Sequence, residues 1–185
     1  NFDGIIILGG AMNVEDTEEF PELKNELQWL NRITNLNIPI IGICLGAQLL
    51  AKTFGAKVSN HKDNIVEVGY KNISTQINLN KKNPFPKKVY QWHKQGFSLP
   101  KNAKVLAYNS IFKIQAFSIR DKIFGFQFHP EVNKSMILKW NENSKEMLLK
   151  PGAENRTIQL QDHIKHSNYV KIWLENFLKD WLDLN

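Results

Sequence analysis

The sequence contains a single cysteine, Cys44, among its 185 residues, so no disulfide can form within the chain. A lone thiol fits a reducing compartment such as the cytoplasm and leaves Cys44 free to react. Long apolar runs are also missing, and none approaches the roughly 20 residues that a membrane-spanning helix needs. No signal peptide is visible either. We therefore expect a cytoplasmic protein that has no membrane partner.

Signatures of nucleotide and metal binding are absent as well. The sequence has neither G-x-x-x-x-G-K-[ST] nor G-x-G-x-x-G, and one cysteine with dispersed histidines does not make a zinc site. We therefore expect no cofactor and no metal. The formal net charge of +6 comes from scattered lysines, which indicate solvated loops and no nucleic-acid partner. His61, His163 and His166 lie in polar stretches, and we expect them at the surface.

Two strand–helix units are predicted in the first part of the chain. Residues 4–8 and 38–43 are apolar runs rich in isoleucine, as in buried parallel strands. Leucines recur every three or four residues within 18–36, and an apolar helix at 48–54 ends at Gly55. This alternation predicts an α/β fold with a parallel sheet covered by helices on both faces.

The remainder of the chain is less regular, and we expect it to complete a single domain over residues 1–185, since neither a repeat nor a linker divides it. Period-two patterns predict strands, and a three- to four-residue period predicts helices. The expected elements are short strands within 66–79 and 87–107, strands at 114–119 and 122–128 joined by a turn at Arg120-Asp121, a helix at 135–140, a loop at 141–157 and an amphipathic helix at 169–184.

Cys44 lies between Gly42 and Gly46, where the second predicted strand meets the following helix. Glycines two residues to either side of a nucleophile are typical of a sharp turn that only small neighbours permit. Such a turn presents the thiol at the carboxyl end of the sheet and at a helix N-terminus, which favours a thiolate. A small cysteine buried in the core is the alternative interpretation.

His129 and Glu131 flank Pro130 directly after the predicted strand at 122–128. Side chains at positions i and i+2 of an extended segment point the same way, so these two groups share one side. A thiol nucleophile needs a base, and the base needs a partner that orients it. His129 and Glu131 can fill these roles, although an exposed histidine near a helix-capping glutamate would give the same pattern.

Gly9 and Gly10 follow the first predicted strand. A glycine pair in this position lets backbone N–H groups approach a ligand closely, as an oxyanion hole requires. A plain tight turn is the alternative interpretation of the same two residues.

Taken together and in this order, these segments resemble the class I, triad-type glutamine amidotransferase domain of stand-alone members. The family pattern is a glycine-rich strand end, a G-x-C-x-G-x-Q elbow and a late H-P-E, matched here by residues 9–10, 42–48 and 129–131. Gln91-Trp92-His93 also looks like a segment of these members. The resemblance covers residues 2–135. It implies a three-layer sandwich with a mostly parallel central sheet, of the flavodoxin-like type.

The resemblance implies a role for each matching residue. Cys44 would attack the side-chain amide carbon of glutamine, His129 would pass the thiol proton to departing ammonia, and Glu131 would orient His129. Backbone N–H groups of Gly10 and Leu45 would hold the oxyanion. The substrate-binding residues would be Gly9, Gln48 and His93. Water would then hydrolyse the γ-glutamyl thioester on the cysteine.

Three functions stay open within this resemblance. A glutaminase supplies ammonia to an acceptor, and this chain has no signature or room for an ATP-binding synthetase domain. It would therefore either work with a separate synthetase subunit or act as a self-contained hydrolase. A γ-glutamyl peptide hydrolase would use the same triad on another γ-glutamyl compound. A non-catalytic regulatory module on this fold is the third, and the intact triad argues against it.

The sequence departs from the family pattern in two places. It opens at Asn1, without an initiator methionine and without the strand–helix unit that usually precedes the glycine strand, and we expect that unit to be missing from this sequence. Lys94-Gln95 follows Trp92-His93 where stand-alone members commonly have Gly-Asp. This second difference bears on how the charged end of the substrate is held, or on which substrate is used.

Overall fold

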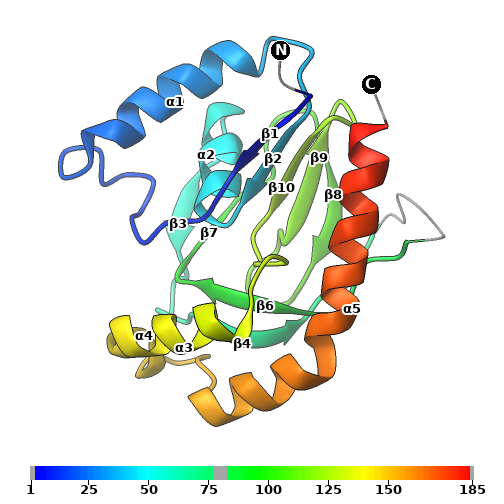
Figure 1. Ribbon diagram of the computed structural model, residues 1–185. Helices are drawn as coiled ribbons and strands as arrows, with labels where there is room; N and C mark the ends of the chain where they lie inside the picture. The colour runs from blue at the N-terminus through cyan, green and yellow to red at the C-terminus, as the bar shows by residue number, and fades with distance from the viewer. Residues whose placement is uncertain (1–2, 77–82, 184–185) are drawn as a thin grey trace.

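A six-stranded sheet forms the centre of the computed structural model, which describes residues 3–76 and 83–183 (Figure 1). Strands β1, β2 and β10 run parallel, whereas β10, β9, β8 and β5 pair antiparallel, so the sheet is mixed. In spatial order the strands are β1 Ile5–Ile7, β2 Ile40–Ile43, β10 Ile123–Phe126, β9 Ala116–Ile119, β8 Ala103–Tyr108 and β5 Ser74–Thr75.

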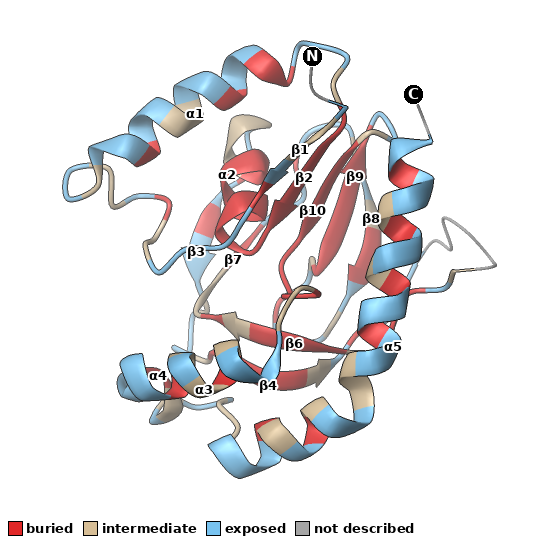
Figure 2. Cartoon of the chain, viewed as in Figure 1, coloured by how far each residue is buried: buried red, intermediate tan, exposed pale blue. Residues whose placement is uncertain are grey.

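Helices cover both faces of this sheet, which confirms the expected three-layer α/β sandwich (Figure 1). Helices α1 (Pro21–Ile33) and α2 (Leu45–Thr53) lie on one face, and α5 (Arg156–Leu182) lies on the other. Because side chains alternate along a strand, neighbouring residues of β2 enter different cores. Ile40 joins the core beneath α1 and α2, and Ile41 joins the core beneath α5. The central strands are almost entirely buried (Figure 2).

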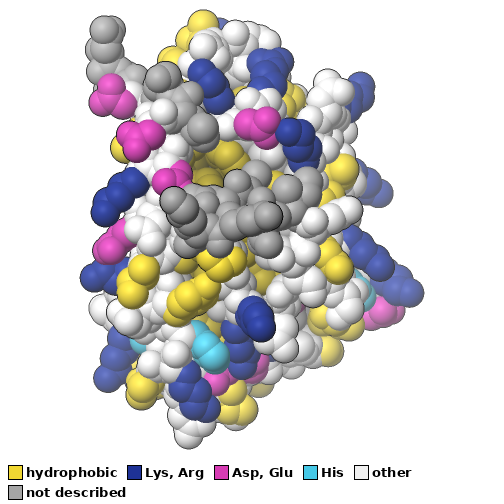
Figure 3. Space-filling model, turned by 90° about the vertical axis from the view of Figure 1, so that its right-hand side faces the viewer, with side chains coloured by type: hydrophobic (Ala, Val, Ile, Leu, Met, Phe, Trp, Pro, Cys, Tyr) yellow, Lys and Arg dark blue, Asp and Glu magenta, His cyan; other side chains and the backbone are white. Residues whose placement is uncertain are grey.

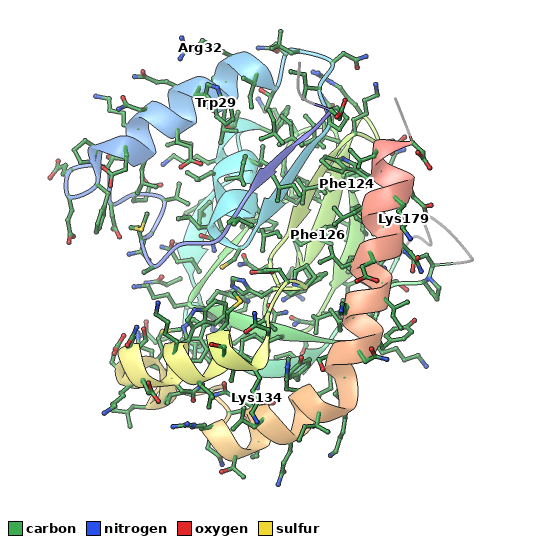
Figure 4. All side chains as sticks on the ribbon, in the orientation of Figure 1. Trp29, Arg32, Phe124, Phe126, Lys134 and Lys179 are labelled. Atoms are coloured by element: carbon green, nitrogen blue, oxygen red, sulfur yellow. The ribbon has the colours of Figure 1, made fainter. Side chains whose placement is uncertain are left out.

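Aromatic side chains dominate the core on the α5 side. Phe124 and Phe126 point from β10 toward α5 (Figure 4), and both belong to a buried cluster with Phe128, as the period-two pattern predicted. The ring centroids of Phe124 and Phe177 are 5.1 Å apart, and those of Phe126 and Trp173 are 5.6 Å apart, both edge to face. Each such pair stabilises the fold by about 0.5–1.5 kcal/mol beyond the area that it buries.

One small sheet and two helices lie at the carboxyl ends of β1, β2 and β10, at the lower end of the molecule in Figure 1, and a second small sheet lies beside α2. Strand β4 (Glu67–Asn72) pairs antiparallel with β6 (Lys88–His93), and β3 (Val58–Asn60) pairs with β7 (Gln95–Phe97). Helix α3 (Lys134–Asn143) and helix α4 (Lys145–Leu148) follow strand β10 along the chain. The β4–β6 sheet, α3 and α4 form a platform that faces the ends of the parallel strands, whereas β3 and β7 pack against α2.

The expected loop at 141–157 is wrong, because α3 continues to Asn143, α4 follows, and α5 begins at Arg156 instead of residue 169. The Asn155 side chain caps α5 by accepting the backbone N–H of Ile158 at 3.0 Å. In the first half of α5 the buried residues, Gln159 and Asp162, are polar, and Gln159 Oε1 accepts the Tyr90 hydroxyl at 2.8 Å. Such polar burial leaves no apolar periodicity in the sequence.

The structure differs from the sequence predictions in three further ways, which concern the exposure of side chains and the length of a strand region. β1 is the edge strand of the sheet, so Ile6 and Leu8 are 44% and 61% exposed instead of buried. His163 was expected at the surface, but its Nδ1 contacts the Tyr70 hydroxyl at 2.9 Å and the residue is half-buried. The strand expected within 66–79 is present up to Thr75, and its last residues, 77–79, lie outside the described part.

Arg120 and Asp121 form the expected turn between β9 and β10, with φ of 54° and 55°.

No helix in the described ranges has the length and apolar character needed to cross a membrane. On the face that carries α5, Lys and Arg side chains are spread out and interleaved with other types (Figure 3). The described residues of that face therefore form no single basic patch.

Substitution of Gly46 by alanine tests how tightly the turn before α2 is packed. Helix propensity alone predicts that alanine stabilises this position by about 1 kcal/mol. A Cβ at Gly46, however, would overlap the backbone carbonyl of Ile7. We expect Gly46→Ala to lower the free energy of unfolding by about 1–3 kcal/mol, as overpacked sites do, measured by urea denaturation.

Gly55→Ala is the matched control, because a Cβ there meets no atom closer than 3.7 Å and only the φ of +79° is unfavourable. The control should lose about 1 kcal/mol. A Gly46→Ala protein as stable as the unmodified chain would contradict the close packing of the turn.

Candidate active site

Cys44 occupies a sharp turn between β2 and α2. Its φ of 50° and ψ of −106° are unfavourable for a residue with a side chain, and such strain persists only where the surroundings impose it. The Cys44 backbone N–H donates to the Phe126 carbonyl at 2.7 Å, which fixes the turn to the end of β10. A Cβ at Gly42 would lie 2.5 Å from the Gly46 carbonyl oxygen. Both glycines of the sequence pattern are therefore required for close packing.

The thiol of Cys44 is buried and surrounded by polar groups. Gln127 Nε2 donates to the sulfur at 3.8 Å, and the Trp92 carbonyl lies 3.9 Å from it. Cys44 is also the N-cap residue of α2, so the partial positive charge of the helix N-terminus acts on the sulfur. The Gln127 N–H group and the helix N-terminus thus both present positive charge to the sulfur.

His129 and Glu131 lie next to the cysteine. The Nδ1 atom of His129 is 2.7 Å from Glu131 Oε1, and the Cys44 sulfur lies close enough to the ring to act on its pKa. The His129 backbone N–H donates to the Tyr90 carbonyl at 2.8 Å, and the Trp140 ring packs edge to face against the imidazole at 4.8 Å between centroids. The imidazole is thus held between a carboxylate and a thiol.

The charge of His129 follows from these neighbours. Burial by itself lowers the pKa of the imidazole, but the Cys44 sulfur and the Glu131 carboxylate more than reverse this effect and raise the pKa to about 10. At neutral pH an imidazolium therefore lies between two groups that favour its positive charge. A protonated imidazole beside a thiol can give its proton to a leaving group.

A cavity of about 360 Å³ opens in front of Cys44 and His129. The loop after β1 forms one wall, where a Cβ at Gly9 would lie 2.9 Å from His129 Cε1 and one at Gly10 would lie 2.7 Å from Leu45 Cδ2. The backbone N–H groups of Gly10 and Leu45 have no hydrogen-bond partner within the described part of the chain. Two free donors beside a nucleophile can accept a developing negative charge.

The opposite wall of the cavity comes from β6, β7, α3 and α4. Gln48 Nε2 donates to the Gln95 carbonyl at 3.1 Å and to Gln127 Oε1 at 3.3 Å. Lys94 and Gln95 also line the cavity, and the Gln95 Oε1 atom is buried without a partner in the described residues, as is Glu131 Oε2. The remaining wall includes apolar side chains that the sequence patterns did not identify, Trp92, Met136, Trp140 and Met147.

His93 differs from the expectation of direct substrate contact. It lies at the cavity wall and is 4% exposed, but its Nδ1 is 2.8 Å from the Gln95 carbonyl oxygen. Its Nε2 is 3.1 Å from Gln91 Oε1 and 3.2 Å from Glu67 Oε2. A substrate group could bond to the ring only by displacing one of these partners. Gln127, by contrast, contacts the sulfur and was not selected from the sequence, although it stands two residues before His129.

All eight predicted site residues line one cavity: Gly9, Gly10, Cys44, Leu45, Gln48, His93, His129 and Glu131. Clusters of three or more histidine, cysteine or acidic side chains that could bind a metal are absent from residues 3–76 and 83–183. Such an arrangement can supply a thiol nucleophile, an adjacent base and N–H donors for an oxyanion.

Comparisons with known proteins agree with this fold and site. The family model "Glutamine amidotransferase class-I" matches residues 1–143. One of the subunits of a glutamine-hydrolyzing GMP synthase from Methanococcus aeolicus is 31% identical over 149 residues, which cover 78% of this chain and 70% of that protein. The chain therefore belongs to the class I glutamine amidotransferase family, which confirms the resemblance seen in the motifs.

A more distant relative and a solved structure extend the comparison. Gamma-glutamyl peptidase 4 of Arabidopsis thaliana is 25% identical over 144 residues, and the match covers 74% of this chain and 56% of that protein. The crystal structure of a glutamine amidotransferase from Thermotoga maritima superimposes with a TM-score of 0.84 at 29% identity, covering 96% of this chain and 77% of that one. The shared architecture confirms the expected fold class.

The protonation of His129 can be followed by NMR of the protein labelled with ¹⁵N-histidine. We expect the His129 ring to keep both protons until the pH approaches about 10. Glu131→Gln should lower this midpoint because it removes a neighbouring negative charge. His163 is an internal reference, since burial and the nearby Lys134 charge lower its pKa. A His129 midpoint near 6.5 would contradict the pairing with Cys44 and Glu131.

The same pKa shift makes stability depend on pH. Folding raises the pKa of His129, so its protonation stabilises the folded state. This stabilisation is fully present below pH 6.5, which is about the pKa of the histidine in the unfolded chain. It is lost as the pH rises through about 10, the pKa in the folded protein. Thermal denaturation between pH 6 and pH 10 should therefore show a steeper loss of stability in the unmodified protein than in His129→Gln. Equal slopes would contradict the shift.

Proposed function

We propose that this chain hydrolyses the side-chain amide of glutamine through a γ-glutamyl thioester on Cys44 and releases ammonia. The observation that carries the proposal is the contact of the Cys44 thiol with an imidazole whose other nitrogen bonds Glu131 at 2.7 Å. Membership of the class I glutamine amidotransferase family supports it independently.

The first half of the reaction forms the thioester. The Cys44 sulfur attacks the amide carbon, a C–S bond forms, and the carbonyl oxygen becomes an oxyanion. The backbone N–H groups of Gly10 and Leu45 are placed to hold that oxyanion, because neither has another partner in the described part. His129 then gives its proton to the amide nitrogen, the C–N bond breaks, and ammonia leaves.

The second half of the reaction regenerates the enzyme. A water molecule enters the position left by ammonia, His129 takes one of its protons, and the hydroxide attacks the thioester carbon. The C–S bond then breaks, glutamate leaves, and the protonated His129 again faces the sulfur. Glu131 stays ionised throughout, fixes the ring by its bond to Nδ1, and stabilises the imidazolium.

The substrate chain is assigned to the wall formed by Gly9, Gln48 and the Trp92–Gln95 segment. Gly9 lets the loop after β1 pass close to His129 without a side chain in the way. Both amide protons of Gln48 are used inside the protein, so its carbonyl oxygen is the group left to accept an N–H from the substrate. Lys94 supplies a positive charge at the same wall for a substrate carboxylate.

Ammonia released at this site needs an acceptor, and we assign that role to a separate synthetase subunit. The relative from Methanococcus aeolicus is named as one subunit of a synthase, and the chain spans 64–70% of the length of several such subunits. A cytoplasmic location, the absence of a nucleic-acid partner and a single-domain organisation over 1–185 remain part of this proposal.

A γ-glutamyl peptide hydrolase is the second candidate, and the apolar part of the cavity is the observation that favours it. Met136 and Met147 from α3 and α4 line the cavity together with Trp140. Ammonia needs no apolar wall, whereas an amino acid leaving group with an apolar side chain could be held there. The similarity to gamma-glutamyl peptidase 4 of Arabidopsis thaliana points the same way.

Ammonia release from glutamine tests the proposed reaction. We expect the purified chain to release ammonia, Cys44→Ala to lose all turnover, and Glu131→Gln to lose about 100-fold in kcat because the imidazole is no longer oriented and stabilised. Glu142→Gln makes the same chemical change at an exposed helix position and should keep full activity. Unchanged activity in Glu131→Gln would remove Glu131 from the triad.

A comparison of substrates separates the two candidates. We expect kcat/KM for glutamine to exceed that for γ-glutamyl-leucine. The reverse order, together with a selective loss of the dipeptide activity in Met147→Ala, would favour the peptide hydrolase. Absence of turnover with both, and of Cys44 labelling by a glutamine-like chloroketone, would leave only a non-catalytic module.

A further inference from the structure

A buried acidic residue, Glu67 on β4, lies behind the active site and is bonded on both oxygens. Its Oε1 accepts Asn109 Nδ2 at 2.6 Å, and its Oε2 accepts Gln115 Nε2 at 2.8 Å. The same Oε2 is 3.2 Å from Nε2 of His93 on β6. Glu67 and His93 are 2% and 4% exposed, and the proposed reaction makes direct use of neither.

The hydrogen bonds around this pair have only one consistent direction. The carboxylate of Glu67 can only accept, so Gln115 turns its NH₂ group toward it and its oxygen away. Gln91 Nε2 donates to that oxygen at 2.6 Å, which turns Gln91 Oε1 toward His93 Nε2 at 3.1 Å. Nε2 of His93 therefore faces two acceptors and must carry a hydrogen.

The other ring nitrogen of His93 also faces an acceptor. Nδ1 lies 2.8 Å from the backbone carbonyl oxygen of Gln95, which has no hydrogen to give. Both nitrogens are thus donors, and a histidine with two N–H groups is an imidazolium. A buried positive charge needs an anion beside it, and Glu67 is the carboxylate in contact.

The fixed orientation of the His93 ring also determines how side chains at the cavity are oriented. The Gln95 carbonyl that accepts from His93 also accepts Gln48 Nε2, which in turn donates to Gln127 Oε1. Gln127 is thereby turned so that its Nε2 faces the Cys44 sulfur at 3.8 Å. The same bonds leave the Gln48 carbonyl oxygen as the group available to a ligand. A chain of bonds with a single direction therefore runs from Glu67 to the nucleophile.

We propose that Glu67 and His93 form a buried ion pair that positions Gln48, through the Gln95 carbonyl, to recognise the γ-glutamyl chain of the substrate. This rests on the proposed function for the part played by Gln48. A neutral His93 could move its single proton to Nε2 and turn a lone pair toward the Gln95 carbonyl. The doubly protonated ring has no such alternative, and the charge of Glu67 keeps it in that state.

The ion pair is tested by ¹⁵N-histidine NMR on the full chain at pH 7.5. We expect both His93 ring nitrogens to carry protons in the unmodified protein and only one to do so in Glu67→Gln. A singly protonated His93 in the unmodified protein would overturn the ion pair, whether or not the protein turns over glutamine. If Glu67→Gln does not fold, Glu67→Gln/His93→Gln should recover the fold, because no unpaired charge is left; failure to recover would also overturn the pair.

The positioning role is tested with two variants of His93. Asparagine can place an N–H near the position of Nδ1 and keep the donor to Gln95, whereas glutamine reaches toward Nε2 and loses that donor. We expect His93→Gln to raise KM for glutamine by about tenfold or more, with kcat changed by less than about threefold. His93→Asn should lie closer to the unmodified protein.

Alkylation of Cys44 by iodoacetamide separates positioning from general damage to the site. This small reagent does not bind through Gln48 and senses only the Gln127 end of the chain of bonds, so its rate should change far less than KM for glutamine in both His93 variants. Equal effects of both variants on kcat, KM and alkylation would reduce His93 to a structural residue and overturn the positioning role, as would an unchanged KM in His93→Gln. Lack of turnover in the unmodified chain would count against the proposed function, while the NMR result would still decide the ion pair.

Discussion

The backbone hydrogen bond from Cys44 to the Phe126 carbonyl, 2.7 Å long, is the contact on which the arrangement of the site depends. It joins the ends of two adjacent parallel strands, β2 and β10, in the register that sets Gly125 opposite Gly42. This bond holds Cys44 at its unfavourable φ and fixes its distance from His129, three residues beyond Phe126. Strain at the nucleophile is therefore sustained by sheet pairing and by the close approach of two glycines.

That Cys44, His129 and Glu131 lie together at one site could be predicted from the sequence because each is placed by its immediate neighbours. Glycines at 42 and 46 determine the turn that carries Cys44, and an extended His-Pro-Glu segment determines that His129 and Glu131 share a side. The alternation of strands and helices along the chain predicted the three-layer sandwich. The alternate phenylalanines predicted which face of β10 is buried, and that face packs against α5. The parallel order of β2 and β10 then brings the two motifs to one edge.

Other features depend on partners distant in sequence and left no local pattern. The first half of α5 carries polar side chains such as Gln159. The burial of Gln159 is explained by the hydrogen bonds that its side chain makes with Tyr90 and Asn141. The exposure of β1 follows from its place at the sheet edge, which an apolar run of isoleucines does not reveal. His93 was recognised as part of a motif, but its role depends on Glu67, which stands in a different strand.

The distance along the chain between Cys44 and its partners has a consequence for biosynthesis. Cys44 acquires its base, its N–H donor and its strained backbone only when β10 has paired with β2, and the residues of β10 are made long after the cysteine. On the ribosome, and in any unfolded copy, the residue is an ordinary thiol. A chain that ends before residue 129 therefore contains Cys44 without the imidazole and the carboxylate that surround it in the folded protein.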